Sequence, residues 1–208
     1  MCNLNYPYKV KSLPYDMVSL EPVIDKTTLV IHHDKIYLSY VEKFNLIIKE
    51  NKDLSNYSIE ELIYNPYLIP PTILNKTLYY AGGIYNHELF FDNLTSSKHN
   101  MINGLFNKMI IDEYKSFDNY KNIILSLAAS PINYHWIITT IDYKNKIEMF
   151  PSNIVAGLFK FSKKERLFCF NYSRPWKFRT NDRLQHRRTT YSTYNKSCTI
   201  SINRIRRC

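Results

Sequence analysis

The sequence predicts an α+β protein in which a long antiparallel α-hairpin precedes a mixed α/β part with a small antiparallel sheet. Residues 26–50 and 72–93 contain no proline and repeat apolar side chains at helical spacing. Residues 133–150 are rich in aromatic and β-branched side chains around a turn, which is typical of paired strands. From residue 166 the periodicity fades, so we expect a divergent or disordered C-terminal part. The expected domains are an α-hairpin domain over 1–95, an α/β domain over 101–165 and a basic divergent tail over 166–208.

The first long helix is expected to follow an extended arm. Residues 1–24 are punctuated by tyrosine and proline, which favours extended chain over helix. Asp25 suits the N-cap of a helix over 26–50, because its carboxylate can accept a hydrogen bond from a free backbone N–H group of the first turn.

A short helix and a proline-containing connection are expected between the two long helices. Ser58 and Glu61 have the spacing of a capping box. Three prolines within residues 66–71 oppose helix in the stretch that follows. The second long helix is therefore expected over 72–93, antiparallel to the first.

The second half of the chain is expected to be mixed. Residues 111–130 are interpreted as one more helix. Two antiparallel strands should follow within 133–150, joined by a turn at Asp142–Asn145.

The net charge of +10 lies entirely in the C-terminal tail, because lysines and acidic residues balance over residues 1–165. The first 165 residues contain no arginine, whereas residues 166–208 contain nine. No apolar run approaches the roughly 20 residues that a membrane span needs, and no hydrophobic stretch opens the chain. We therefore expect a cytoplasmic protein without a membrane partner, and a basic tail that could bind nucleic acid or an anionic surface only as an alternative function.

Histidines on the two predicted helices carry the candidate chemistry. His32, Ile36 and Tyr40 share one face of the first helix, and His33 points about 100° away from them. On the second helix, His87 follows Gly82 and Gly83.

Each mid-helix glycine costs roughly 1 kcal/mol relative to alanine, which indicates that another group approaches the backbone closely there. Two facing helices could direct His32 and His87 at one point about 2 Å from each imidazole, as metal ligands are. By spacing alone, two packed histidines in an aromatic core explain the pattern equally well.

Five segments resemble the signature stretches of the iron/manganese superoxide dismutases, in the same order and at the same separations. They are LPYD (13–16), LEPVIDKTT (20–28), IHHDK (31–35), the YV of SYVEKFN (39–45) and AGGIYNHELFF (81–91). The resemblance implies that His32 and His87 bind one Fe or Mn ion, that Tyr40 is the catalytic tyrosine beside the substrate path, and that Trp136 lines the metal pocket. It further implies superoxide as the substrate, superoxide dismutase activity and a homodimer.

The chain also departs from the family pattern. Ile36 and Ile84 stand where polar residues are usual, Tyr79–Tyr80 replace an asparagine pair, and Phe91 replaces a tryptophan.

The family's remaining two ligands, an aspartate and a histidine four residues later, have no well-matched motif in this chain. Asp182 and His186 have the right spacing without the expected neighbours, and they are the candidates for those positions. The alternative functions are an inactive superoxide dismutase-like protein with an incomplete metal site, or a binder of nucleic acid or anionic surfaces through the tail. A frameshift near residues 150–168 is one hypothesis for the abrupt onset of arginine.

Overall fold

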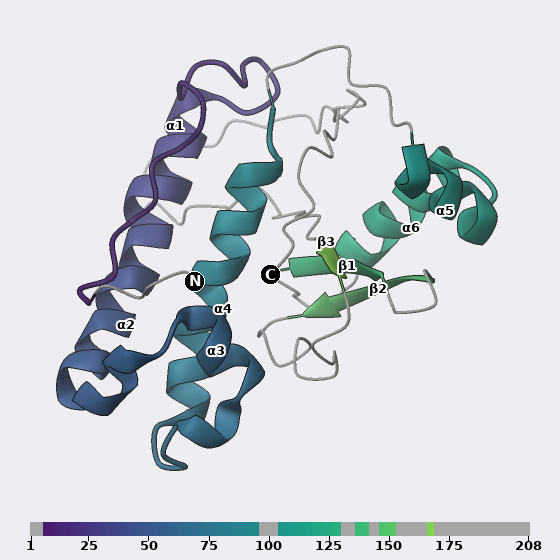
Figure 1. Cartoon of the computed structure of the whole chain (residues 1–208). Coiled ribbons are helices and arrows are strands. Elements are labelled where there is room, and N and C mark those ends of the chain that lie inside the picture. Colours follow the sequence, from purple (N-terminus) through teal and green to yellow (C-terminus); the bar gives the residue numbers. More distant parts are fainter. Residues whose placement is uncertain (1–5, 96–103, 130–135, 142–145, 153–165, 169–208) are drawn as a thin grey trace, which may run out of the picture.

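Two long helical stretches lie side by side in the N-terminal part of the protein, and a small sheet with two further helices lies beside them (Figure 1). The computed structural model describes residues 6–95, 104–129, 136–141, 146–152 and 166–168. The α+β class predicted from the sequence is confirmed. No helix in these ranges is both long and apolar enough to cross a membrane.

The first helical stretch is continuous but changes its winding in the middle. It runs through α1 (Lys26–Val30), the π-helix η1 (Ile31–Tyr37) and α2 (Leu38–Glu50). The predicted N-cap is confirmed, because the Asp25 carboxylate accepts a hydrogen bond from the Thr28 backbone N–H at 2.8 Å. Residues 6–24 precede it as the predicted arm, which contains turns but no helix.

The connection between the long helices consists of three short helical elements. They are η2 (Lys52–Asn56), α3 (Ile59–Tyr64) and η3 (Pro66–Leu68). The capping box of Ser58 and Glu61 is present at the start of α3, as predicted. The expectation that the prolines exclude helix was wrong at Pro66, which opens a 3-10 turn. The first helical position needs no N–H donor, so proline is tolerated there.

The second long helix, α4 (Leu74–Asn93), begins two residues after its predicted start. A turn closed by the Ile73 N–H and the Pro70 carbonyl (3.1 Å) precedes it. Its buried residues include Ala81, Gly83, Ile84 and His87, and the helix packs against the first helical stretch and against α3.

The single helix predicted over 111–130 is two helices. They are α5 (Gly104–Tyr114) and α6 (Phe117–Ala128). Lys115 has a left-handed backbone (φ 68°), and the Ser116 hydroxyl accepts a hydrogen bond from the Asn119 N–H to cap α6. This serine cap was not predicted from the sequence.

The predicted strand pair is confirmed and is part of a three-stranded sheet. The strands β1 (Trp136–Ile141) and β2 (Ile147–Ser152) pair antiparallel from Trp136 opposite Ser152 to Ile141 opposite Ile147. A third strand, β3 (Arg166–Phe168), pairs antiparallel with β1 and lies in a segment where no regular structure was predicted. The predicted turn at 142–145 lies outside the described residues.

The central strand β1 separates two hydrophobic cores. Trp136 and Ile138 belong to the core of the helical hairpin, whereas Ile137 and Ile141 belong to the core formed with α5 and α6. Successive side chains of a strand point to opposite faces, so one strand can serve both cores. The sheet therefore lies between the hairpin and the helices α5 and α6 (Figure 1).

Candidate metal centre

The imidazole rings of His32 and His87 meet where η1 packs against α4. Their centroids are 5.1 Å apart, and the rings are nearly perpendicular. His32 is 9% exposed and His87 is 2% exposed. Two residues separated by 55 positions in the sequence thus share one buried site between the two long helices.

The orientation of the His87 ring is set by its own helix. Its Nδ1 lies 2.6 Å from the carbonyl oxygen of Gly83, one turn earlier in α4. A carbonyl can only accept, so Nδ1 carries the proton and Nε2 keeps its lone pair. Histidines that bind metals commonly donate their other ring N–H to a backbone carbonyl in this way.

Burial keeps both imidazoles neutral. Desolvation, with a smaller contribution from the nearby His33, lowers the pKa of His32 to about 4. Desolvation also lowers the pKa of His87 to about 3, with His32 adding to the effect. A neutral imidazole is the form that binds a metal ion.

The π-helix η1 changes which residue of the first helix faces His87. The spacing in the sequence predicts that Ile36 lies between His32 and Tyr40 on that face. In the structure Tyr37 is the fully buried residue there, and its ring stacks on His87 at 5.6 Å and 18°. A π-helix has more residues per turn than an α-helix, so the residue five positions after His32 takes the place expected four positions after it.

Tyr40 completes the aromatic wall on the hairpin side. Its ring lies 5.1 Å from the His87 ring, and its hydroxyl is 3.1 Å from that of Tyr79. Burial and the hydrogen bond to Tyr79 raise the pKa of Tyr40, so its hydroxyl stays protonated at neutral pH. A Cβ atom on Gly83 would lie 2.2 Å from Tyr40 Cδ1, which confirms the predicted close approach to the glycine pair at this position.

The sheet contributes one side chain to the same site. Trp136, at the start of β1, packs edge-on against His87 with ring centroids 4.9 Å apart. Phe90 and Phe91 close the side next to His32, at 5.1 and 5.2 Å. The two imidazoles are therefore surrounded by aromatic side chains on every side that these contacts define.

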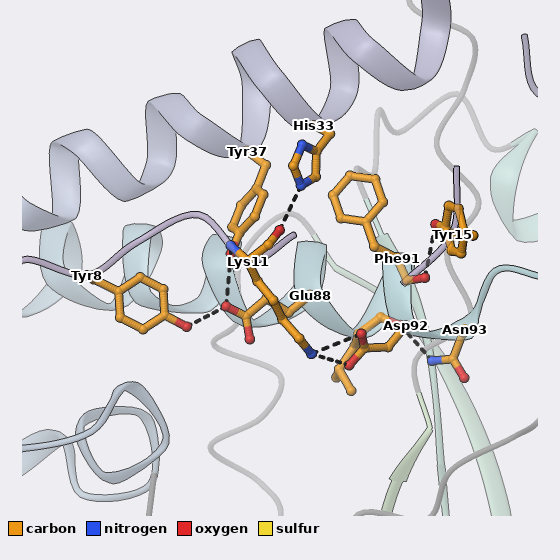
Figure 2. Close-up of polar contacts among 10 residues, drawn as sticks. Tyr8, Lys11, Tyr15, His33, Tyr37, Glu88, Phe91, Asp92 and Asn93 are labelled. Atoms are coloured by element: carbon orange, nitrogen blue, oxygen red, sulfur yellow. Dashed lines mark hydrogen bonds and ion pairs between the residues drawn. The ribbon is translucent and has the colours of Figure 1, made fainter. Parts of the chain in front are cut away.

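The arm is held to both long helices by a polar network (Figure 2). The Tyr8 and Tyr37 hydroxyls both donate to Oε1 of Glu88, the second at 2.9 Å. Lys11 uses its backbone N–H to donate to the Tyr37 hydroxyl at 3.2 Å, and its ammonium pairs with Asp92 at 2.7 Å.

Two further contacts between the arm and the long helices use backbone carbonyls as acceptors. Nε2 of His33 donates to the Lys11 carbonyl at 2.8 Å, so His33 faces the arm and not His87. The Tyr15 hydroxyl donates to the Phe91 carbonyl at 3.0 Å. The two adjacent histidines therefore serve different neighbours, as their predicted directions imply.

The residues in the structure fit part of a metal site. Two neutral, buried imidazoles, one with its tautomer fixed by a carbonyl, are a suitable pair of donors for iron or manganese. Asp182 and His186 lie outside the described residues. Within the ranges that the structure does describe, no group of three or more His, Cys, Asp or Glu side chains gathers as a metal site.

Two residues of the site were missed by the sequence analysis. Tyr37 was missed because a regular helix was assumed through η1. Glu88 was missed although a carboxylate inside the apolar run HELFF is a signal in itself, since such a group needs hydrogen-bond donors when buried. Burial raises the pKa of Glu88 above its ordinary value, and the hydrogen bonds from the two tyrosines offset part of that rise.

Comparison with known proteins gives a family match for the hairpin. The family model described as iron/manganese superoxide dismutases, alpha-hairpin domain, matches residues 7–95. These residues include both histidines of the site, Tyr37, Tyr40 and the polar network of the arm.

Curated relatives are named manganese superoxide dismutases. The chain is 32% identical over 143 residues to superoxide dismutase [Mn] 1 of Leptolyngbya boryana, a match that covers 69% of this chain and 58% of the relative. It is 33% identical over 133 residues to superoxide dismutase [Mn] 2 of Bacillus anthracis, covering 63% of this chain and 64% of the relative. It is 32% identical over 129 residues to superoxide dismutase [Mn] of Listeria monocytogenes, covering 62% and 64%. The chain thus spans about three fifths of the length of these relatives.

Proposed function

We propose, from the premise that residues 7–95 belong to the α-hairpin domain of the iron/manganese superoxide dismutases, that this chain is a superoxide dismutase with one Fe or Mn ion bound through His32 and His87. The observation that carries the proposal is the meeting of these two buried imidazoles, 5.1 Å apart, inside an aromatic enclosure. Asp182 and His186 are proposed as the other two protein ligands, by their spacing. A homodimer is proposed from the family alone.

A bound iron or manganese ion would supply one-electron exchange with two successive superoxide anions, giving dioxygen and hydrogen peroxide. The chain's own residues provide the other requirements. His32 and His87 supply neutral nitrogen donors, and the Gly83 carbonyl holds His87 in one tautomer. Trp136 and Phe90 limit the space around them, so a diatomic anion is admitted in preference to larger molecules.

Peroxide formation consumes protons, and Tyr40 is the proposed source nearest to the histidines. Its hydroxyl is protonated at neutral pH because its pKa is raised by burial and by the hydrogen bond to Tyr79. The 3.1 Å contact with the Tyr79 hydroxyl gives a partner from which the proton can be replaced. Tyr79 is partly exposed, so this pair connects the site toward the surface.

The activity of the full chain loaded separately with manganese and with iron tests the proposal. We expect superoxide dismutation with at least one of the metals. A Tyr40→Phe variant, which keeps the ring and loses the hydroxyl, should be slower by about tenfold or more, because a positioned proton donor contributes on the order of 10²–10⁴ in rate. Tyr64→Phe, on the short helix α3, is the matched control and should keep the rate. Absence of dismutation with both metals in a folded, metal-loaded chain would contradict the proposal.

A further inference from the structure

We infer that Glu88 is a positioning residue for His87, acting through Tyr37, and that the arm residue Tyr8 holds Glu88 in place. The inference rests on the proposed function, in which His87 binds the metal ion. Figure 2 shows the side chains of Tyr8, Tyr37 and Glu88 converging between the arm, η1 and α4.

Tyr37 is the link between the carboxylate and the imidazole. Its ring lies almost parallel to the His87 ring, at 5.6 Å and 18°. Its hydroxyl donates to Glu88 at 2.9 Å and accepts from the Lys11 N–H at 3.2 Å. The Tyr37 hydroxyl both donates and accepts a hydrogen bond, and these two bonds restrict movement of the Tyr37 ring. Because the His87 ring stacks on Tyr37, we infer that the plane of the imidazole is restricted as well.

Glu88 gathers contacts from three parts of the hairpin domain. Glu88 lies next to His87 in α4 and accepts hydrogen bonds from the Tyr37 hydroxyl of η1 and the Tyr8 hydroxyl of the arm. Tyr8 is itself fixed by Asn45 of α2, whose side-chain amide bonds both the N–H and the carbonyl of Tyr8 at 2.8 Å. The carboxylate is thus the point at which the arm and both helices are joined.

Two separate constraints are needed to fix an imidazole, one for its direction and one for its plane. The Gly83 carbonyl supplies the direction through Nδ1 of His87. The stacked Tyr37 ring supplies the plane, and Glu88 fixes Tyr37. Partners of this kind around metal-binding histidines typically change metal affinity by 10–100-fold when they are removed.

The chain offers a matched control one turn further along α4. Asp92 also joins the helix to the arm through a carboxylate, by its ion pair with Lys11 at 2.7 Å. Asp92 bonds the arm at the Lys11 ammonium, whereas Glu88 accepts from the Tyr37 hydroxyl, so Asp92→Asn weakens the attachment of the arm and leaves the Tyr37–Glu88 hydrogen bond in place.

The test uses the full chain labelled with ¹⁵N-histidine. In the metal-free protein, the His87 ring of the wild type should give one sharp set of NMR signals with the proton on Nδ1, identified by its loss in His87→Gln. We expect Glu88→Gln and Tyr37→Phe to broaden or shift these signals, and to raise the Kd for Mn²⁺ by about 10–100-fold. Asp92→Asn should leave both unchanged. Tyr8→Phe removes only the hydroxyl that the arm donates to Glu88, and it should give a smaller change in the same direction. This variant takes the place of Glu88→Gln in the test if Glu88→Gln does not fold.

The inference is overturned if Glu88→Gln, Tyr37→Phe and Asp92→Asn all lower Tm while the His87 signals and the Kd stay as in the wild type. The network would then only anchor the arm. A different result separates the two proposals: the wild type binds no Mn²⁺, but the His87 signals differ between the wild type and Glu88→Gln. The positioning role then stands and the proposed function fails. The two failures are therefore distinguishable.

Discussion

The two cores on either side of strand β1 differ in what they bury. The hairpin core encloses the side chains of His32, His33, Asn86 and His87 among its apolar residues. The core of α5, α6 and the outer face of the sheet is mainly apolar, and its polar contacts include a hydrogen bond between the Tyr120 and Thr139 hydroxyls at 2.9 Å and one from the Tyr114 hydroxyl to the Ile147 carbonyl at 3.4 Å.

This difference indicates that, within the described residues, the hairpin core carries the candidate site and the other core has a structural role. Burying polar groups costs free energy unless each finds a partner, so a core that contains several of them is retained for a reason other than stability. The outer core has the composition of a structural support. The strand between them presents Trp136 to the site and Ile137 to the support.

The largest expected effects come from these two neighbouring residues. Trp136→Ala should destabilise the chain by about 3–5 kcal/mol and weaken metal binding, because the indole packs on His87. Ile137→Ala should cost about 2–5 kcal/mol and leave metal affinity unchanged, because it faces the other core. Urea unfolding measures the free energy of unfolding, and Mn²⁺ titration measures the metal affinity. Trp136→Phe and Ile137→Val are smaller changes at the same two positions. Equal loss of metal affinity in the two variants would show that the cores are not functionally separate.

Gly83→Ala should test the contact between the helices of the hairpin. The new Cβ would lie 2.2 Å from Tyr40 Cδ1, so the ring must move, at a cost of about 1–3 kcal/mol. In a Tyr40→Ala background the same substitution should instead stabilise the helix, by up to about 1 kcal/mol, because the clash is gone and alanine is the better helix former. A double-mutant cycle from thermal unfolding gives the coupling. Equal effects of Gly83→Ala in both backgrounds would exclude the contact as the reason for glycine.

Much of the hairpin follows from local signals in the sequence. Asp25 and Ser58 mark helix starts because their side chains satisfy free N–H groups, and this depends only on near neighbours. The pairing of His32 with His87 was also accessible, because each lies on the buried face of a long helix. The π-helix could not be predicted from the sequence, since Tyr37 makes its contacts with His87 and Glu88, which lie 50 and 51 positions further along the chain.

Outside the hairpin, local signals were weaker. The helical pattern breaks between α5 and α6 where Lys115 adopts a left-handed backbone conformation. Lysine rarely adopts this conformation, so the residue type gives no signal of the break. The Ser116 cap was hidden within an apparently continuous helical pattern. The strand β3 depends on pairing with β1, which no local pattern in its three residues predicts.

Tyr120→Phe should sharpen the comparison from the structural side. It removes the hydroxyl that pairs with Thr139 in the outer core. Leaving the buried Thr139 hydroxyl without this partner should cost about 1–3 kcal/mol. Metal affinity should not change, and chemical denaturation with Mn²⁺ titration checks both. A loss of metal affinity here would mean that the support core transmits strain to the site.

Lys11→Met should have the smallest effect. The ion pair of Lys11 with Asp92 is partly exposed, with side-chain exposures of 39% and 26%, so solvent screens it. We expect a loss of about 0–1 kcal/mol that disappears in concentrated salt. Thermal unfolding at low and high ionic strength measures it. A larger, salt-independent loss would show that the lysine chain holds the arm by packing.

The central claim is that His32 and His87 bind one metal ion together, and metal content tests it most directly. After loading with Mn²⁺ and removal of free metal, the wild type should retain close to one ion per chain. His33→Gln alters an adjacent buried histidine that faces the arm and should retain the metal as well. His32→Gln and His87→Gln should each lose it. Retention of the metal in those two variants at the wild-type level would contradict the account.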